Sequence, residues 1–249
     1  MTPPPAPAVR YGDHPDQLAN LHLPAADGGP WPVVVVLHGG FWRERWDRTT
    51  ATPLARDLAA RGYVAWNVEY RRVGQEGGGW PGTFDDVAAA VDALADVDEA
   101  DTEQIAAVGH SAGGHLALWL AGRENPRVRV RAAVSLAGVA DLAGAARAGL
   151  GDGAVADLLG GGSDDVPERY ASASPAALVP LGVRQLLVHG GRDEIVPAAQ
   201  SRDYAKIARA AGDDVELLEL PGADHFDVID PGHDAWAAVV ERLPRLLGV

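Results

Sequence analysis

The sequence predicts an α/β protein in which helices cover both faces of a mostly parallel sheet. Short apolar runs alternate with longer helical stretches along most of the chain, as expected for consecutive β-α-β units. The runs are continuously apolar rather than alternating, as at residues 33–37, which is typical of strands buried on both faces. The chain has 249 residues, of which 47% are hydrophobic, so it is long enough to bury a sizeable core.

Six apolar runs are expected to form the main strands, at residues 33–37, 64–68, 105–108, 132–136, 185–188 and 215–220. Residues 9–23 differ, because two short segments flank a turn at residues 12–15, and we expect them to form an antiparallel edge. Apolar spacing predicts helices between the strands, at residues 51–61, 83–94, 111–121, 201–211 and 234–247.

One domain is expected over residues 9–249, since no linker-like segment divides the chain. Residues 1–8 are rich in proline and are expected to form a disordered lead-in. The stretch at residues 141–177 is longer than a simple crossover between strands. We therefore expect a small helical cap inserted there, over the carboxyl ends of the strands, where active sites of open α/β sheets lie.

The composition argues against several classes of protein. The chain has no cysteine, which excludes disulfides and thiolate chemistry, and its net charge of −14 argues against a nucleic-acid partner. No apolar run approaches the ~20 residues that span a bilayer, and no leader-like segment opens the chain. We expect a cytoplasmic protein without a membrane partner. No His, Asp and Glu cluster has metal-ligand spacing, so neither a metal nor another cofactor is expected.

The segment Gly109-His110-Ser111-Ala112-Gly113 connects a predicted strand to a predicted helix. This is the context of a G-x-S-x-G turn, in which a serine hydroxyl is exposed at the end of a sheet. Glycine two positions before and after the serine avoids a steric clash in so tight a turn. Ser111 also lies at a helix N-terminus, which favours developing negative charge. We predict that Ser111 is a catalytic nucleophile.

Backbone amides for an oxyanion hole are expected from two places. The strand at residues 33–37 leads directly into Gly39 and Gly40, whose backbone can approach a substrate closely. Ala112 follows the nucleophile and offers a second amide.

The acid and the base are expected after later strands, in the order Ser, Asp or Glu, His. Asp193 lies in a turn after the strand at 185–188, with Glu194 as the nearest competitor. His225 follows the strand at 215–220, and His233 is its competitor. His225 would take the Ser111 proton, and Asp193 would hold the imidazole in the right tautomer. For the remaining histidines we expect structural roles, among them His38, His110, His115 and His189.

Several motifs together resemble those of kynurenine formamidases and the related small carboxylesterases of the hormone-sensitive-lipase-like type. The resemblance rests on His38-Gly39-Gly40-Phe41-Trp42, which looks like their HGGxW motif, and on four further motifs: Tyr70-Arg71, residues 109–117, Ser174-Pro175 and Asp224-His225-Phe226. It implies the α/β-hydrolase fold, with an eight-stranded sheet and one antiparallel strand. It also implies the triad and oxyanion hole described above.

We therefore predict a serine hydrolase that cleaves a small soluble acyl ester or aryl formamide through an acyl-enzyme. A short-peptide hydrolase and a non-enzymatic binding protein on a hydrolase scaffold remain alternatives. Phe41, Trp42 and Trp80 are expected to line the substrate pocket, together with Trp46. The expected partner is a small acyl substrate, and the protein is expected to be a monomer or a homodimer.

Overall fold

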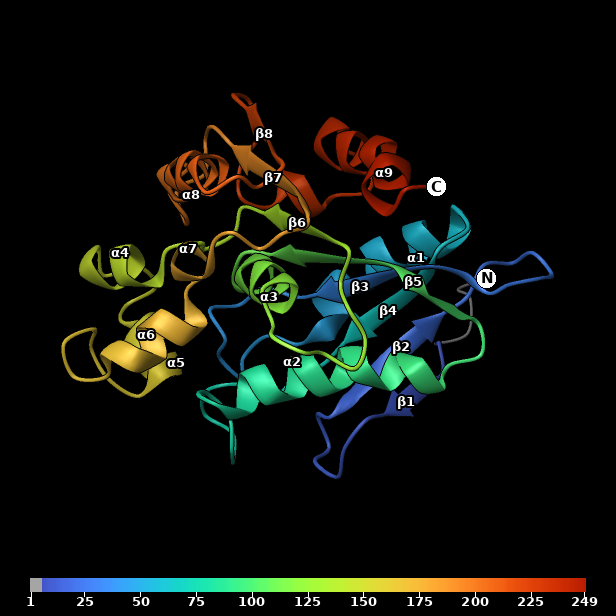
Figure 1. Ribbon diagram of the computed structural model, residues 1–249, viewed down its shortest axis with the longest axis horizontal. Helices are drawn as coiled ribbons and strands as arrows, with labels where there is room; N and C mark the ends of the chain where they lie inside the picture. The colour runs from blue at the N-terminus through green and yellow to red at the C-terminus, as the bar shows by residue number, and fades with distance from the viewer. Residues whose placement is uncertain (1–5) are drawn as a thin grey trace.

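An eight-stranded sheet forms the centre of the computed structural model, which describes residues 6–249 (Figure 1). Its strands lie in the order β1-β2-β4-β3-β5-β6-β7-β8. β2 is antiparallel to β1 and β4, and the other neighbouring pairs are parallel. The strands are β1 (Ala8–Arg10), β2 (Leu18–His22), β3 (Trp31–Leu37), β4 (Val64–Val68), β5 (Ala100–His110), β6 (Ala132–Leu136), β7 (Arg184–Gly190) and β8 (Val215–Leu220).

Helices pack on both faces of this sheet, as predicted. The larger ones are α1 (Thr52–Ala60), α2 (Gly82–Asp92), α3 (Ala112–Ala121), α8 (Ala199–Ala210) and α9 (Asp234–Leu247). Three short 3-10 turns adjoin them, η1 (Arg48–Ala51), η2 (Ala93–Asp96) and η3 (Asp227–Ile229). α1 and α9 cover one face, and α2, α3 and α8 cover the other (Figure 1). Successive side chains of β3 enter the two core clusters in turn, so this strand is buried on both faces, as its continuous apolar run predicts.

The observed boundaries differ from the predicted ones in informative places. β5 extends from Ala100 to His110, well beyond the predicted residues 105–108, because its polar first half still pairs with β3. β1 begins at Ala8, which the sequence assigned to the lead-in, so that assignment is wrong at this residue. Ala8 pairs with Asn20 of β2. Ala6 and Pro7 of the predicted lead-in are described and accept hydrogen bonds from Asn20 and Leu21 of β2. Residues 1–5 lie outside the described residues.

Four short helices occupy the predicted cap insertion between β6 and β7. They are α4 (Leu142–Arg147), α5 (Ala154–Leu159), α6 (Pro167–Ala173) and α7 (Pro175–Leu178), and they gather at one side of the molecule (Figure 1). Arg43, from the segment after β3, bonds to Asp157 of α5 at 2.9 Å. The insertion therefore contacts a segment that follows the carboxyl end of a strand.

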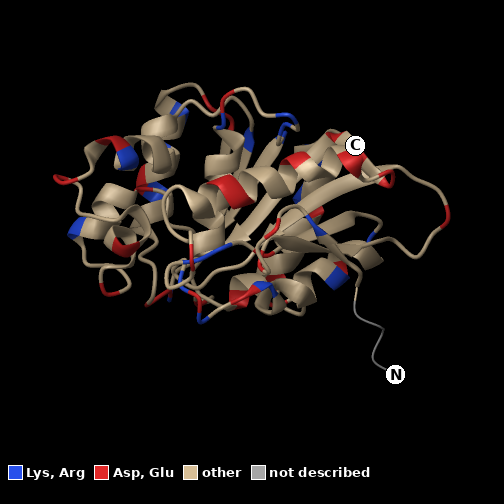
Figure 2. Cartoon of the chain, turned by 90° about the horizontal axis from the view of Figure 1, so that it is seen from below, with Lys and Arg blue, Asp and Glu red and all other residues tan. Residues whose placement is uncertain are grey.

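Charged residues lie mainly on the outer helices and loops, whereas most of the sheet is free of them (Figure 2). Four charged residues are nevertheless buried: Glu69, Arg72, Asp86 and Asp213. Buried charges need partners. Glu69 and Arg72 pair with each other beside the site described below, Asp86 pairs with Arg71, and Asp213 accepts from the amides of Leu181 and Gly182. Within residues 6–249, every helix is too short or too polar to cross a membrane.

Candidate active site

Segments that follow β3, β5, β7 and β8 meet around a cavity of about 300 Å³. These strands run in the same direction, so their carboxyl ends lie at one edge of the sheet. Residues from outside the cap insertion line the cavity: Gly39, Gly40, Phe41, Trp46, Thr50, His110, Ser111, Ile195, His225, Phe226 and Ile229. The insertion thus lies beside this cavity rather than over it.

Ser111 stands alone between β5 and α3, in a strained backbone conformation. Its φ of 54° and ψ of −116° are unusual for a residue with a side chain. Its amide donates to the Leu136 carbonyl at 2.8 Å, which fixes the turn to the neighbouring strand β6. A Cβ on Gly109 would lie 2.0 Å from the Gly113 oxygen, and one on Gly113 would lie 2.2 Å from the Leu37 oxygen. Both glycines are therefore required by close backbone packing, as predicted for this turn.

Asp193 and His225 form a hydrogen-bonded pair behind the cavity wall. Nδ1 of His225 donates to Oδ2 of Asp193 at 2.7 Å, and the amides of Ile195 and Val196 donate to Oδ1 at 2.9 and 2.8 Å. Burial alone would raise the pKa of Asp193, but hydrogen bonds from His189 and His225 outweigh it and lower that pKa well below its ordinary value. An ionised Asp193 fixes the proton of neutral His225 on Nδ1, which leaves Nε2 as a base.

The alternative acid and base are used elsewhere or face solvent. Glu194 is exposed. His233 caps α9, where its Nδ1 accepts a hydrogen bond from the amide of Ala235 at 3.1 Å.

Ser111 and His225 line the same cavity, although no hydrogen bond joins their side chains within the described part of the chain. Such bonds often tighten only when a substrate is bound.

His189 is a partner of Asp193 that the sequence analysis did not assign to the site. Its Nε2 lies 2.9 Å from the carbonyl oxygen of Val196 and 3.2 Å from Oδ2 of Asp193. Both oxygens are acceptors, so Nε2 carries the ring proton, and Nδ1 accepts from the Ser201 hydroxyl at 2.7 Å. The only signal in the sequence is its position at the end of a strand, four residues before Asp193.

The predicted oxyanion residues lie against the nucleophile. A Cβ on Gly39 would be 3.2 Å from Cβ of Ser111, and Gly40 has a φ of 115°, which favours glycine. Ala112 is the first residue of α3, so its amide has no acceptor within the helix. Gly39 and Gly40 line the same cavity as Ser111, and Ala112 follows Ser111 directly, so their backbone is placed where amides could bind an oxyanion.

His110 connects the nucleophile turn to the loop that carries His225. Its Nε2 donates to the His225 carbonyl at 2.9 Å, and the two ring centroids are 4.6 Å apart. Burial, helped by the nearby His225, lowers the pKa of His110 to about 3, so the ring is neutral. A neutral His110 adds no positive charge beside His225.

Two of the predicted pocket aromatics do not reach the cavity. Phe41 and Trp46 line it, but Trp42 is fully buried, and its indole N–H donates to His115 at 3.2 Å. Trp80 packs edge-on against Phe84 of α2, with ring centroids 5.0 Å apart. The prediction is wrong for Trp42 and Trp80: Trp42 points into the core, and the partly buried Trp80 packs against the core instead of the cavity. Further apolar side chains of the wall come from Ile195, Phe226 and Ile229.

Among the side chains of residues 6–249, no group of three or more His, Asp or Glu residues is arranged to hold a metal ion. The polar groups gathered at the cavity are a hydroxyl, an imidazole, a carboxylate behind it and backbone amides.

The BD-FAE family profile matches residues 19–207 of this chain. Among curated proteins, the esterase LipC of Mycobacterium tuberculosis (strain ATCC 25618 / H37Rv) is 33% identical over 247 residues, covering 89% of this chain and 60% of that protein. The probable isoprenylcysteine alpha-carbonyl methylesterase ICME of Oryza sativa subsp. japonica is 28% identical, covering 89% of this chain and 58% of that protein. The chain thus spans about three fifths of the length of these relatives.

Solved esterase structures share the fold. The thermophilic esterase Est2 of Thermogutta terrifontis, with butyrate bound, has a TM-score of 0.77 at 24% identity, covering 98% of this chain and 94% of that one. A truncated carbohydrate esterase from gut microbiota has a TM-score of 0.83 at 18% identity, covering 97% of this chain and 95% of that one. With the observed sheet, these similarities confirm the predicted α/β-hydrolase fold.

Proposed function

The chain belongs to the BD-FAE family of α/β-hydrolase-type esterases, and on that premise we propose that it is a serine carboxylesterase acting through an acyl-enzyme at Ser111. One observation carries the proposal: Ser111, His225 and the Gly39-Gly40 backbone line a single cavity, and Asp193 holds His225 from behind. The names of the curated relatives also support an esterase.

In the proposed reaction, Nε2 of His225 takes the hydroxyl proton as Oγ of Ser111 attacks the ester carbonyl. The amides of Gly39, Gly40 and Ala112 stabilise the oxyanion of the tetrahedral intermediate. When the intermediate collapses, His225 gives the proton to the departing alcohol, and the acyl group stays on Ser111. Water, activated by His225, then releases the acid.

We propose a small acyl ester as the substrate. The cavity of about 300 Å³ is at the lower end of the range for small-molecule sites, and apolar side chains form much of its wall. An aryl formamide is the second candidate, and the HGGxW-like segment His38–Trp42 favours it. Both substrates need the same nucleophile, base and oxyanion amides, so the polar groups of the site do not separate them.

Hydrolysis of 4-nitrophenyl acetate by wild type and by Ser111→Ala tests the proposal. We expect the substitution to reduce kcat by at least about 10⁴-fold, since the reaction would lose its nucleophile. Ser172→Ala, at an exposed serine of α6, is the matched control and should keep full activity. Wild-type turnover by Ser111→Ala would overturn the assignment. Specificity constants for N-formylkynurenine and short 4-nitrophenyl esters would then decide between formamide and ester.

A further inference from the structure

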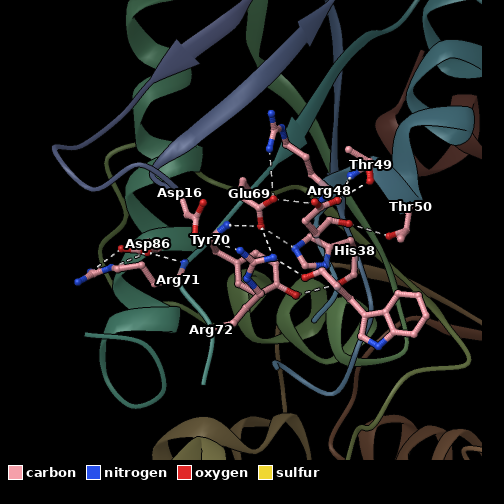
Figure 3. A network of polar contacts seen from close by, with 12 residues as sticks. Asp16, His38, Arg48, Thr49, Thr50, Glu69, Tyr70, Arg71, Arg72 and Asp86 are labelled. Carbon is pink, nitrogen blue, oxygen red and sulfur yellow. Dashed lines mark hydrogen bonds and ion pairs between the residues drawn. The ribbon is translucent and has the colours of Figure 1, made fainter. Parts of the chain in front are cut away.

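Glu69, directly after β4, is the centre of a buried polar network beside the cavity (Figure 3). Its Oε1 lies 3.1 Å from Nε2 of His38 and 3.1 Å from Nη1 of Arg72. Its Oε2 accepts from the amide of Arg48 at 3.0 Å and lies 3.3 Å from the Arg48 guanidinium. The mechanism above uses neither Glu69 nor His38.

Both ring nitrogens of His38 have a close oxygen neighbour. Nδ1 lies 2.8 Å from the carbonyl oxygen of Gly39, which can only accept a hydrogen bond, so Nδ1 carries a proton. Nε2 faces Glu69. Burial alone would raise the pKa of Glu69, but the hydrogen bond from His38 and the charges of His38 and Arg72 lower it, so Glu69 is ionised. Each ring nitrogen of His38 thus faces an oxygen atom, and the ring bridges the Glu69 carboxylate and the Gly39 carbonyl.

Tyr70 holds the His38 ring in this orientation. The two rings are stacked, with centroids 4.3 Å apart and planes at 7°. The Tyr70 hydroxyl donates to the backbone oxygen of His38 at 2.9 Å. The ring thus has little freedom to move away from Gly39.

The bond from His38 to Gly39 acts on one of the proposed oxyanion donors. The Gly39 carbonyl and the Gly40 amide belong to one peptide unit, which is trans. In a planar trans unit the C=O and the N–H point in opposite directions. A hydrogen bond to the oxygen therefore fixes the direction of the Gly40 N–H, and it also polarises that N–H into a stronger donor.

Glu69 also contacts the far end of the segment 38–48, which begins at His38 and ends at Arg48. Arg72, paired with Glu69, donates through Nη1 to the backbone oxygen of Trp46, and the Arg48 amide binds Glu69 directly. One carboxylate thus contacts both ends of the segment that runs from His38 to Arg48 and contains Gly40 and the cavity-lining Trp46.

We propose that Glu69 and His38 are positioning residues for the oxyanion hole: Glu69 orients the His38 ring, which fixes and polarises the Gly39-Gly40 peptide. This inference rests on the proposed esterase function. The pair touches neither the nucleophile nor the base, so its effect should appear in stabilisation of the oxyanion and leave the proton transfer by His225 unchanged.

Glu69→Gln, compared with Asp86→Asn, tests the proposal. Asp86 is also fully buried and bonds to Arg71 at 2.7 and 2.8 Å, and its hydrogen bonds in the described structure go to Gln17 and Arg71 rather than to the segment 38–48. Both substitutions should lower the melting temperature. Only Glu69→Gln should lower kcat on 4-nitrophenyl acetate, by about 10- to 100-fold, less than the loss of a whole oxyanion donor. Each rate is divided by the concentration of active sites, which is measured by titration with a fluorophosphonate. All assays are run below the melting temperatures of both variants.

A pair of His38 variants keeps the proposal testable if Glu69→Gln does not fold. His38→Asn retains an N–H donor near the position of Nδ1, whereas His38→Gln places its amide near Nε2, and both lose the stacking on Tyr70. We expect kcat of His38→Asn to exceed that of His38→Gln by about tenfold, and affinity for a boronic acid that mimics the tetrahedral intermediate to follow the same order.

Three results would overturn the proposal: full kcat in Glu69→Gln, an equal loss in Asp86→Asn, or no difference between the two His38 variants. These results are distinct from failure of the proposed function, in which wild type itself would neither hydrolyse the ester nor react with the fluorophosphonate.

Discussion

Ser111 and Asp193 are fixed by different means. The backbone of Ser111 is held in a strained conformation with a φ of 54°, because closely packed glycines and the bond to Leu136 leave the turn no alternative. The side chain of Asp193 is held instead by two backbone amides and two imidazoles. A change at Asp193 can therefore alter His225, the proposed base, without disturbing the turn at Ser111.

Asp193→Asn should leave the fold intact and reduce kcat by about 10³- to 10⁴-fold, as loss of the carboxylate does in other triads. The Asn oxygen would still accept from Ile195 and Val196, so its NH₂ group would face His225 and make Nδ1 an acceptor. The proton would then lie on Nε2, which could no longer act as a base. Steady-state kinetics with 4-nitrophenyl acetate measures the loss. Activity within tenfold of wild type would contradict the role given to Asp193.

Residues that follow strand ends could be predicted from the sequence, whereas the directions of some side chains could not. Ser111, Asp193 and His225 each follow an apolar run, and the parallel sheet brings them together. Trp42 was misplaced because Phe41 and Trp42 have φ values of 53° and 56°, and nothing in the sequence indicates such a turn. The pairing of His38 with Glu69 joins two strand ends 31 residues apart in the chain, which needs the strand order.

At the scale of elements, β3, β5 and α3 can approach one another closely because glycines occupy the positions where they meet. Gly109 of β5 contacts the backbone of α3, and Gly113 of α3 contacts the backbone at the end of β3. The nucleophile turn thus has its position because two strands and a helix approach without a Cβ between them.

Gly109→Ala should destabilise the protein by about 3 kcal/mol or more, since its Cβ would lie 2.0 Å from the Gly113 oxygen and backbone atoms would have to move. Gly222→Ala is the control, because no atom lies within 4 Å of its Cβ and its φ is not positive. Urea denaturation measures both. Equal midpoints for the two variants would show that the close crossing does not constrain the turn.

Helices and strands with a clear apolar period were predicted within a few residues. The prediction was weaker for the first half of β5, which is polar and is held by pairing with β3. It was also weaker for the position of the cap, because short helices contribute little periodicity and their packing depends on contacts such as Arg43 with Asp157.

At the scale of the whole molecule, buried neutral histidines link stability to pH. Burial lowers the pKa of His110 to about 3 and that of His115 to about 4. His115 donates from Nε2 to the Ala173 carbonyl at 2.9 Å and accepts from Trp42 at Nδ1, so a second ring proton would break the contact with Trp42. His115 thereby joins α3 to the cap helix α6.

Acid should therefore destabilise the fold, starting below pH 6.5. Both folded-state pKa values are lowered, so the unfolded chain takes up the protons first, and stability present above pH 6.5 is lost as the pH falls toward 4. Each histidine should remove about 1.4 kcal/mol of unfolding free energy per pH unit in that window. For His115→Gln, the unfolding free energy is measured by urea denaturation between pH 7 and 4.5. It should depend on pH less steeply than in wild type, by the equivalent of about one proton taken up on unfolding. An unchanged slope would mean that His115 is not neutral in the folded state.

Covalent labelling by a fluorophosphonate, mapped by mass spectrometry of the digested protein, tests the central claim most directly. A fluorophosphonate reacts with a serine only where a base and an oxyanion hole activate it. The account predicts one label per chain, on the peptide that contains Ser111, and no label after Ser111→Ala. An intact protein that remains unlabelled, or that carries its label on another serine, would contradict it.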